Sequence, residues 1–97
     1  MMVLITYDIS LDSEGGERRL RRIAEHCLDY GVRVQYSVFE CEVTPAQWVQ
    51  LKNKLLNEYD ESVDSLRFYQ LGSNWQRKVE QYGAKKSIDI FKDILIL

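Results

Sequence analysis

Proline, cysteine and histidine are scarce in this sequence. A single proline and 45% hydrophobic residues exclude a disordered or low-complexity chain. The two cysteines, Cys27 and Cys41, form no CxxC motif, and His26 is the only other side chain that could join them as a soft metal ligand. We therefore expect two buried, reduced thiols rather than a metal or redox site.

Long apolar runs and a strong excess of one charge are also absent. No stretch approaches the roughly 18 apolar residues that span a bilayer, and the start MMVLITYD lacks the positive segment of a signal peptide. We therefore expect a cytoplasmic protein without membrane contact. The net charge of −2 argues against a surface that binds nucleic acid over its whole area, but it leaves local basic patches open.

The chain is short. Its 97 residues fit a single domain, 1–97, and a domain of this size buries roughly two-thirds of the surface that its unfolded chain exposes. The hydrophobic core is small, so association with a second copy would help to stabilise it.

The first part of the chain predicts a strand and a helix. The run VLITYD, residues 3–8, is rich in β-branched and aromatic side chains, which is typical of a buried strand. Apolar side chains recur at helical spacing within residues 17–30, and Gly31 is the expected end of that helix. These apolar side chains are Leu20, Ile23, Ala24, Cys27 and Leu28.

Two further strands and a second helix follow. Residues 32–43 predict a strand on each side of a turn at residues 35–37. Thr44, Pro45 and Gln47 have the spacing of a capping box with proline at the first helical position, so the second helix begins at Pro45. The side chains that this helix is expected to bury are Trp48, Leu51, Leu55 and Tyr59.

A last strand over residues 65–71 completes a βαββαβ order. This order predicts an α+β, ferredoxin-like domain, in which an antiparallel four-stranded sheet carries both helices on one face. The other face is left bare, and we expect Leu66 and Phe68 to expose apolar area there. A two-fold homodimer that packs sheet against sheet is the simplest cover.

The segment 74–97 shows no helical period. It contains a short candidate strand at residues 79–82 and ends in the apolar run 94–97. Because a free hydrophobic end favours aggregation, we expect this segment to add a strand to a sheet edge of the other protomer or of another partner.

Asp8 stands where the first strand meets the loop into the first helix. A strand end beside a helix N-terminus favours an anion such as phosphate. The alternative is structural, with Asp8 merely starting a turn with Ser10. One carboxylate is too few for a metal-dependent nuclease, but two Asp8 side chains across a dimer axis would supply the one or two carboxylates that usually hold Mg²⁺.

Basic side chains open the first helix. They are Arg18, Arg19, Arg21 and Arg22. These arginines form either a solvated face, in which Glu25 pairs with Arg21 or Arg22, or a ridge that contacts phosphates and that Arg33 and Lys85-Lys86 extend.

Several aromatic side chains could stack on bases, although aromatic residues in strands more often belong to the core. They are Tyr7, Tyr36, Phe39, Tyr69 and Trp75. Ser37 has no neighbouring base or acid to activate it, so a serine nucleophile is not expected.

Three segments resemble CRISPR-associated protein 2, a family of small proteins that partner the spacer integrase. They are VLITYD at the N-terminus, GVRVQYSVFEC further on, and SLRFYQLG after the second helix. The resemblance implies a ferredoxin-like homodimer whose C-terminal segment adds a strand to the partner's sheet. It also implies metal-dependent cleavage of RNA or DNA and a part in spacer acquisition.

The same resemblance implies functional residues. The family's Mg²⁺-binding aspartate matches Asp8, so one Mg²⁺ or Mn²⁺ ion would be shared between the two Asp8 residues of a dimer. An arginine of the first helix would contact nucleic acid, with Arg18, Arg19 and Arg22 as the candidates. Further motif positions near the cleft are matched by Tyr7, Arg33, Ser37 and Phe39.

Three functions remain open. In the first, the protein is an Mg²⁺-dependent endonuclease in which the paired Asp8 residues hold the metal. In the second, it is a non-catalytic scaffold that bridges the spacer integrase and holds DNA across its basic face, so that Asp8 is dispensable. The third is a toxin-like RNase on the same fold.

Overall fold

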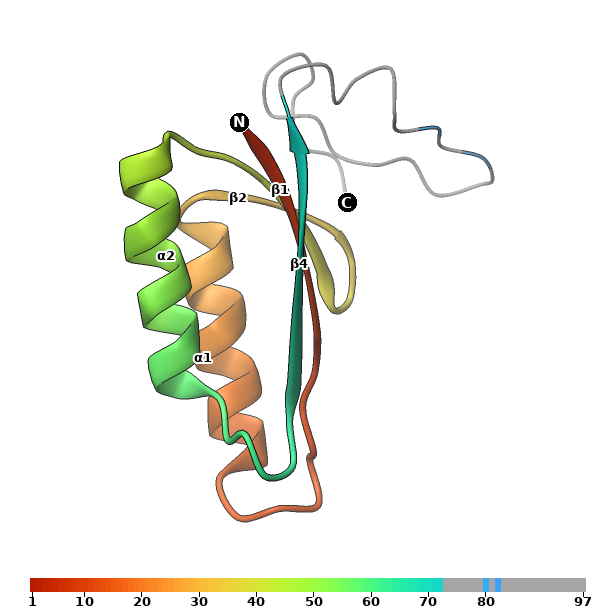
Figure 1. The fold of residues 1–97 in the computed structure, drawn as a ribbon. Helices are drawn as coiled ribbons and strands as arrows, with labels where there is room; N and C mark the ends of the chain where they lie inside the picture. Colours follow the sequence, from red (N-terminus) through yellow and green to blue (C-terminus); the bar gives the residue numbers. More distant parts are fainter. Residues whose placement is uncertain (73–79, 81, 83–97) are drawn as a thin grey trace.

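The computed structural model describes residues 1–72, 80 and 82 of the chain. Within them the elements follow the expected βαββαβ order (Figure 1). They are β1 (Met2–Asp8), α1 (Gly16–Leu28), β2 (Gly31–Gln35), β3 (Val38–Glu42), α2 (Pro45–Glu58) and β4 (Ser65–Gly72). Apart from Glu80 and Tyr82, the candidate strand at 79–82 and the apolar run 94–97 lie outside the described residues. The same holds for Trp75, Lys85 and Lys86.

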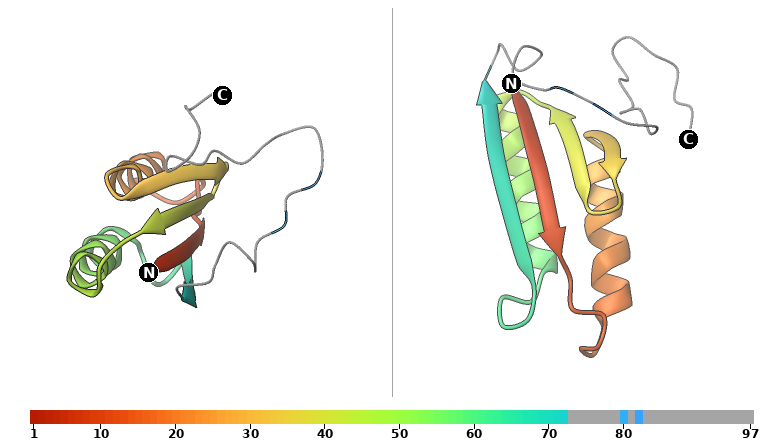
Figure 2. Two further views of the ribbon diagram at one scale, coloured as in Figure 1. Left: turned by 90° about the horizontal axis from the view of Figure 1, so that it is seen from above. Right: turned by 90° about the vertical axis from the view of Figure 1, so that its right-hand side faces the viewer.

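The four strands form one antiparallel sheet in the order β2-β3-β1-β4. Both helices lie on the same face of this sheet, and no described element covers the other face (Figures 1 and 2). The predicted α+β, ferredoxin-like arrangement of strands and helices is confirmed. β1 and β3 occupy the centre of the sheet. The pairing of β1 with β3 stops at Thr6, so at the end of β1 only β4 pairs with Asp8, through Ser65.

The core lies between the sheet and the two helices. Alternate residues of β1 point into it, and they meet side chains of β3 and of both helices. Fully buried members include Val3, Ile5, Ile23, Phe39 and Leu51. Each large apolar side chain buried in this way contributes about 1.5–3 kcal/mol. This packing fixes which residues of β1 remain on the opposite face.

Helix boundaries follow local chemistry at α2 and tertiary packing at α1. The capping box is present, because the Gln47 N–H donates to Thr44 Oγ1 at 3.2 Å and the Thr44 N–H donates to Gln47 Oε1 at 2.9 Å. The prediction that Gly31 ends the first helix is wrong, since α1 ends at Leu28 and Gly31 opens β2. A side chain at Gly31 would collide with the Glu40 carbonyl, so glycine allows β2 to approach β3 closely.

The expected position of Leu66 and Phe68 is also wrong. Phe68 pairs with Ile5 and Leu66 pairs with Tyr7, which places both on the helix-covered face. The Phe68 ring packs edge-on against Trp48 with 4.9 Å between ring centroids. The register was ambiguous in sequence because a shift by one residue exchanges the two faces of a strand.

The uncovered face of the sheet is therefore a mixed surface rather than an apolar one. Its residues alternate with the core positions of β1, β3 and β4. We call this surface the open sheet face, and it includes Leu4, Thr6, Asp8, Val38, Arg67 and Tyr69.

The two cysteines are free and buried, as expected for structural thiols. Burial raises the pKa of Cys41 to about 12 and raises the pKa of Cys27 as well, so both stay protonated and unreactive. Neither of the two helices in the described part of the chain has the length and apolar character that crossing a membrane requires.

Candidate metal and nucleic-acid site

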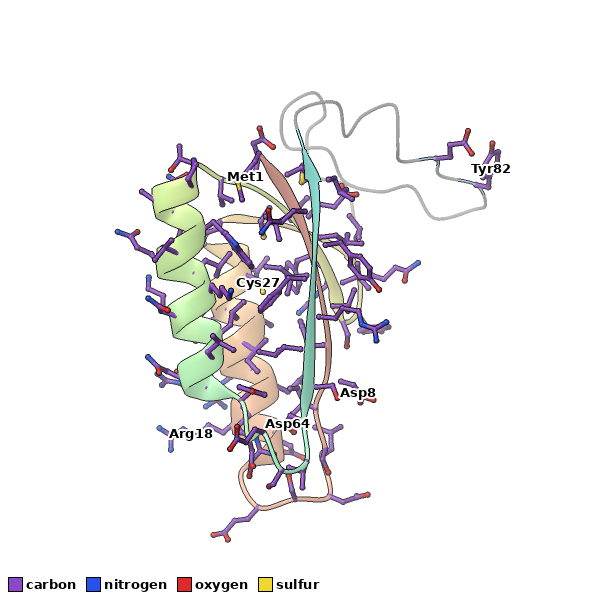
Figure 3. The ribbon with its side chains drawn as sticks, in the orientation of Figure 1. Met1, Asp8, Arg18, Cys27, Asp64 and Tyr82 are labelled. Carbon is purple, nitrogen blue, oxygen red and sulfur yellow. The ribbon has the colours of Figure 1, made fainter. Side chains whose placement is uncertain are left out.

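Asp8 is exposed at the end of β1, on the open sheet face (Figure 3). It lies in a shallow open groove of about 340 Å³. The groove is lined by Thr6, Tyr7, Asp8, Ser65, Leu66 and Arg67. The Asp8 carboxylate makes no hydrogen bond or ion pair with any other described residue, so its oxygens remain available to a ligand.

The strand end that carries Asp8 is held by a second, buried aspartate. Asp64 directly precedes Ser65, the residue opposite Asp8 in the sheet. Its Oδ1 accepts the Ser10 N–H at 2.9 Å, and its Oδ2 accepts the Asp60 N–H at 2.8 Å. Asp64 therefore ties the loop after β1 to the loop before β4, and it fixes the backbone on both sides of the groove.

Arg19 completes this junction from α1. Its Nε donates to Asp64 Oδ2 at 2.7 Å and its Nη2 donates to Asp64 Oδ1 at 3.2 Å. The same guanidinium donates to the Glu14 carbonyl at 2.7 Å and to Ser13 Oγ. Arg19 thus has its donors occupied within the protomer, which leaves little of its charge for a nucleic acid.

The charge state of Asp64 follows from these contacts. Burial alone raises the pKa of a carboxyl, but the Arg19 guanidinium and the backbone N–H groups of Asp60 and Ser10 outweigh it and hold the pKa of Asp64 below its usual range. Sequence reasoning missed Asp64, because it lies in the acidic stretch 60–64, which looks like an exposed loop. No local pattern distinguishes the buried aspartate from its exposed neighbours.

Two glycines let the loop after β1 close on this junction. Gly15 adopts a positive φ of 75°, which side chains other than glycine rarely tolerate. A side chain at Gly16 would collide with the Ser10 carbonyl. The Gly15-Gly16 pair therefore allows α1 to begin close to the end of β1.

Three of the four helix arginines are paired. Arg21 contacts Glu25 at 3.8 Å on the exposed face of α1. Arg22 Nε donates to Glu58 Oε1 at 2.8 Å, and His26 Nε2 lies 3.2 Å from the same oxygen. The two contacts with Glu58 join α1 to the end of α2, and they stabilise the packing of the helices.

Arg18 differs from the other three because it is exposed and forms no ion pair with a described residue. Figure 3 shows its side chain beyond the helices, on the side of the molecule opposite to Asp8. The structure therefore does not bring Arg18 and Asp8 into one site within a protomer.

Tyr7 and Phe39 belong to the core. Their rings stack with 6.1 Å between centroids, and neither is accessible to a base. The Tyr7 hydroxyl donates to the Tyr36 carbonyl at 3.3 Å, and the Tyr7 N–H donates to the Ser37 carbonyl at 3.1 Å. Both rings therefore pack in the core of this protomer, and the Ser37 backbone holds Tyr7 in place. The nucleic-acid contact expected for Tyr7, Ser37 and Phe39 stays a prediction.

Arg33 lies on the helix side of the sheet. Its guanidinium carbon is 5.1 Å from the centroid of the Phe39 ring, and it lines a hollow beside α1 rather than the Asp8 groove. Burial raises the pKa of Tyr7, although the neighbouring Arg33 opposes that change. Arg33 and Asp8 therefore do not share a pocket within the protomer.

The donor set at the groove is small for a hard cation. No group of three or more histidine, cysteine, aspartate or glutamate side chains converges among the described residues. Mg²⁺ needs few protein ligands, because it is usually held by one or two carboxylates together with water and substrate phosphates. One protomer supplies a single exposed carboxylate, which is the lower end of that range, and a second Asp8 across a two-fold axis would bring the number to two.

Comparison with known proteins gives a consistent family. Residues 1–79 match the family model described as CRISPR associated protein Cas2. The chain is 63% identical over 89 residues to the CRISPR-associated endoribonuclease Cas2 of Nitratidesulfovibrio vulgaris, covering 92% of this chain and 87% of that protein. It is 54% identical over 90 residues to the CRISPR-associated endonuclease Cas2 of Halalkalibacterium halodurans, covering 93% and 94%.

A solved structure shares both fold and sequence with this chain. The crystal structure of Streptococcus pyogenes Cas2 at pH 6.5 superposes with a TM-score of 0.76 at 57% sequence identity. The superposition covers 86% of this chain and 100% of that chain.

Proposed function

Because the chain belongs to the CRISPR associated protein Cas2 family, we propose that it is an endonuclease that cleaves RNA or DNA as a homodimer. The observation that carries this proposal is the exposed Asp8 carboxylate, which has no competing partner among the described residues. The names of the relatives, endoribonuclease and endonuclease, support nuclease chemistry. Their CRISPR-associated names favour this function over a toxin-like RNase.

The cofactor of this proposal is Mg²⁺ or Mn²⁺, held by the Asp8 carboxylates of both protomers. Such an ion, when bound, polarises a phosphodiester and lowers the pKa of a bound water. The chain's own contribution is to fix the backbone that carries the carboxylate. Asp64 and Arg19 hold the loop after β1, and Tyr7 anchors the end of β1 in the core, so the position of Asp8 is set before substrate arrives.

The open sheet face supports the homodimer. Both helices cover the other face, so packing the open sheet faces of two protomers together would bury apolar side chains such as Leu4 and Val38. It would also bring together two copies of the groove at the end of β1. The residues from 74 to 97 would extend this contact to the partner protomer or to the spacer integrase.

The position of Arg18 favours a second, compatible function as a scaffold. Its exposed charge, which forms no ion pair within the described part of the chain, lies on the side of the molecule opposite to Asp8. A duplex of foreign DNA held along the helix side would contact Arg18 without approaching the groove. The protein would then bridge the spacer integrase through nucleic-acid and protein contacts that do not need Asp8.

The test compares purified wild type with Asp8→Asn, using Asp12→Asn as a matched control in the exposed loop after β1. Cleavage of single-stranded RNA, single-stranded DNA and duplex DNA is measured with Mg²⁺ and with EDTA, and spacer integration is measured in parallel. We expect Asp8→Asn to lose at least about 100-fold in cleavage, since even outer-sphere changes at metal sites cost 10–100-fold. The dimer and the Tm should be unchanged.

The outcomes separate the two functions. Undiminished cleavage by Asp8→Asn would contradict the nuclease proposal. Lost cleavage with normal integration would show that the scaffold acts without the nuclease. Loss of integration in Arg18→Gln, with cleavage retained, would support the separate helix-side contact.

A further inference from the structure

Arg67 lies beside Asp8 on the open sheet face. In the register of β1 and β4, Asp8 is opposite Ser65 and Thr6 is opposite Arg67. Asp8 and Arg67 are therefore diagonal neighbours on the same face, and such neighbours are about 7–8 Å apart. Both side chains line the same groove.

The charge of Arg67 is not neutralised. Its guanidinium Nη1 donates to the Tyr69 hydroxyl at 3.2 Å, which is a neutral partner. No carboxylate of the described residues lies within ion-pair distance of it, whereas Arg19, Arg21 and Arg22 are each paired with an acid. Arg67 and Asp8 thus line one groove without contacting each other, and neither forms an ion pair with a residue in 1–72.

A phosphodiester accounts for this arrangement. A guanidinium binds phosphate oxygens through two parallel N–H donors, and a carboxylate repels the same phosphate unless a cation lies between them. The diagonal spacing of Asp8 and Arg67 leaves room for one phosphate between them, and a cation held by Asp8 would offset the repulsion between the phosphate and the carboxylate. A direct ion pair would have closed that space.

We propose that Arg67 is the phosphate-binding residue of the Asp8 groove and that Tyr69 is its positioning residue. The inference rests on the proposed nuclease function for the identity of the ligand, which is a phosphate of a nucleic-acid backbone. Tyr69 is 42% exposed and lies two residues after Arg67 in β4, on the same face of the sheet. Because its hydroxyl accepts a hydrogen bond from the Arg67 guanidinium, it restrains the orientation of that group. Each homodimer carries two such pairs.

Binding measured without cleavage isolates this role. All variants are made in the Asp8→Asn background and studied in EDTA with two fluorescein-labelled probes, a single-stranded RNA and a DNA duplex of equal length. The affinity is followed as a function of NaCl concentration for Arg67→Gln, Arg67→Lys and Tyr69→Phe. Lys52→Gln, which removes an exposed positive charge from α2, is the matched control.

The salt dependence gives the expected result. Each lost phosphate contact lowers the slope of log affinity against log salt by about 0.7 for a single strand and about 0.9 for a duplex. Arg67→Gln should show that loss of slope and should bind about 10-fold more weakly, since a hydrogen bond to a charged group contributes at least that much. Arg67→Lys should keep the slope, because it keeps the charge. Tyr69→Phe should weaken binding and keep the slope, because the charge remains but its orientation is lost. Lys52→Gln should match the background protein.

Several results would overturn the proposal. One is an unchanged slope of log affinity against log salt in Arg67→Gln. Another is a loss of slope in Lys52→Gln as large as that in Arg67→Gln. A dimer that dissociates in Arg67→Gln, measured by light scattering, would make Arg67 an interface residue instead. Absence of salt-dependent binding to both probes would also refute it. Failure of the nuclease proposal is recognised separately, because the Asp8→Asn single variant would then cleave nucleic acid at the wild-type rate.

Discussion

The Arg19 guanidinium donates two hydrogen bonds to the Asp64 carboxylate, from Nε to Oδ2 at 2.7 Å and from Nη2 to Oδ1 at 3.2 Å. The Asp64 side chain is fully buried, and that of Arg19 is 13% exposed. The pair joins α1 to the start of β4, directly opposite the strand end that carries Asp8. Arg19 is therefore a structural member of the site, although its sequence context resembles a phosphate-binding cluster.

Removing the buried carboxylate should destabilise the fold. We expect Asp64→Ala to lower the free energy of unfolding by at least about 2 kcal/mol, because the Arg19 charge and two backbone N–H groups lose their partner. Urea and thermal unfolding, followed by circular dichroism at one protein concentration, measure the change. Asp12→Ala removes an exposed carboxylate from the loop after β1 and should leave stability nearly unchanged. Equal effects of both substitutions would contradict the assigned role of Asp64.

Acid should weaken the same contact. The folded-state pKa of Asp64 lies below its unfolded value, so the unfolded chain binds the proton first as the pH falls. The stabilisation is complete above about pH 5 and is lost progressively below about pH 4. Glu58 acts in the same direction: burial raises its pKa, but hydrogen bonds from Arg22 and His26 outweigh that effect.

The pH dependence is measured as Tm between acidic and neutral pH. Asp64→Asn should have a lower Tm at neutral pH and a shallower decline in acid, and it should approach the wild type at low pH. Asp12→Asn serves as the control and should follow the wild-type curve. A mutant curve parallel to the wild type over the whole range would show that Asp64 does not contribute through its charge.

Phe39 should affect stability rather than nucleic-acid binding. Its ring is fully buried beneath β1, so Phe39→Leu should cost about 1–2 kcal/mol through imperfect packing. Affinity for a labelled oligonucleotide, measured below the Tm of the variant, should not change. Tyr36→Leu alters an aromatic ring that is 87% exposed at the hairpin turn, and it should leave the Tm unchanged. Lost affinity at normal stability in Phe39→Leu would instead support direct base stacking.

Local patterns were sufficient for most of the fold. The capping box at Thr44 and Gln47 predicted the start of α2, and the apolar spacing predicted α1, because both signals depend on neighbours within a few residues. The register of β4 was not accessible in this way. Its apolar residues occur on both faces, and only pairing with Ile5 and Tyr7 assigns Phe68 and Leu66 to the core.

The site was predicted less completely than the fold. Asp8 stood out because it ends a hydrophobic strand, and that feature is visible in one short segment. The roles of the arginines depend on residues far away in the sequence, since Arg19 meets Asp64 and Arg22 meets Glu58. Sequence spacing placed the arginines in one cluster. Their ion-pair partners show that Arg19 and Arg22 have structural roles.

The sequence by itself determined the order of the elements and marked Asp8 as the carboxylate at the end of the first strand. These features come from side-chain periodicity and turn chemistry, which are local. Only the tertiary structure decided which charges remain free. Coulombic and hydrogen-bonding partners are set by distance in space, so Asp64 neutralises Arg19 across the junction, while Asp8 and Arg67 share one groove and form no ion pair with any residue that the structure describes.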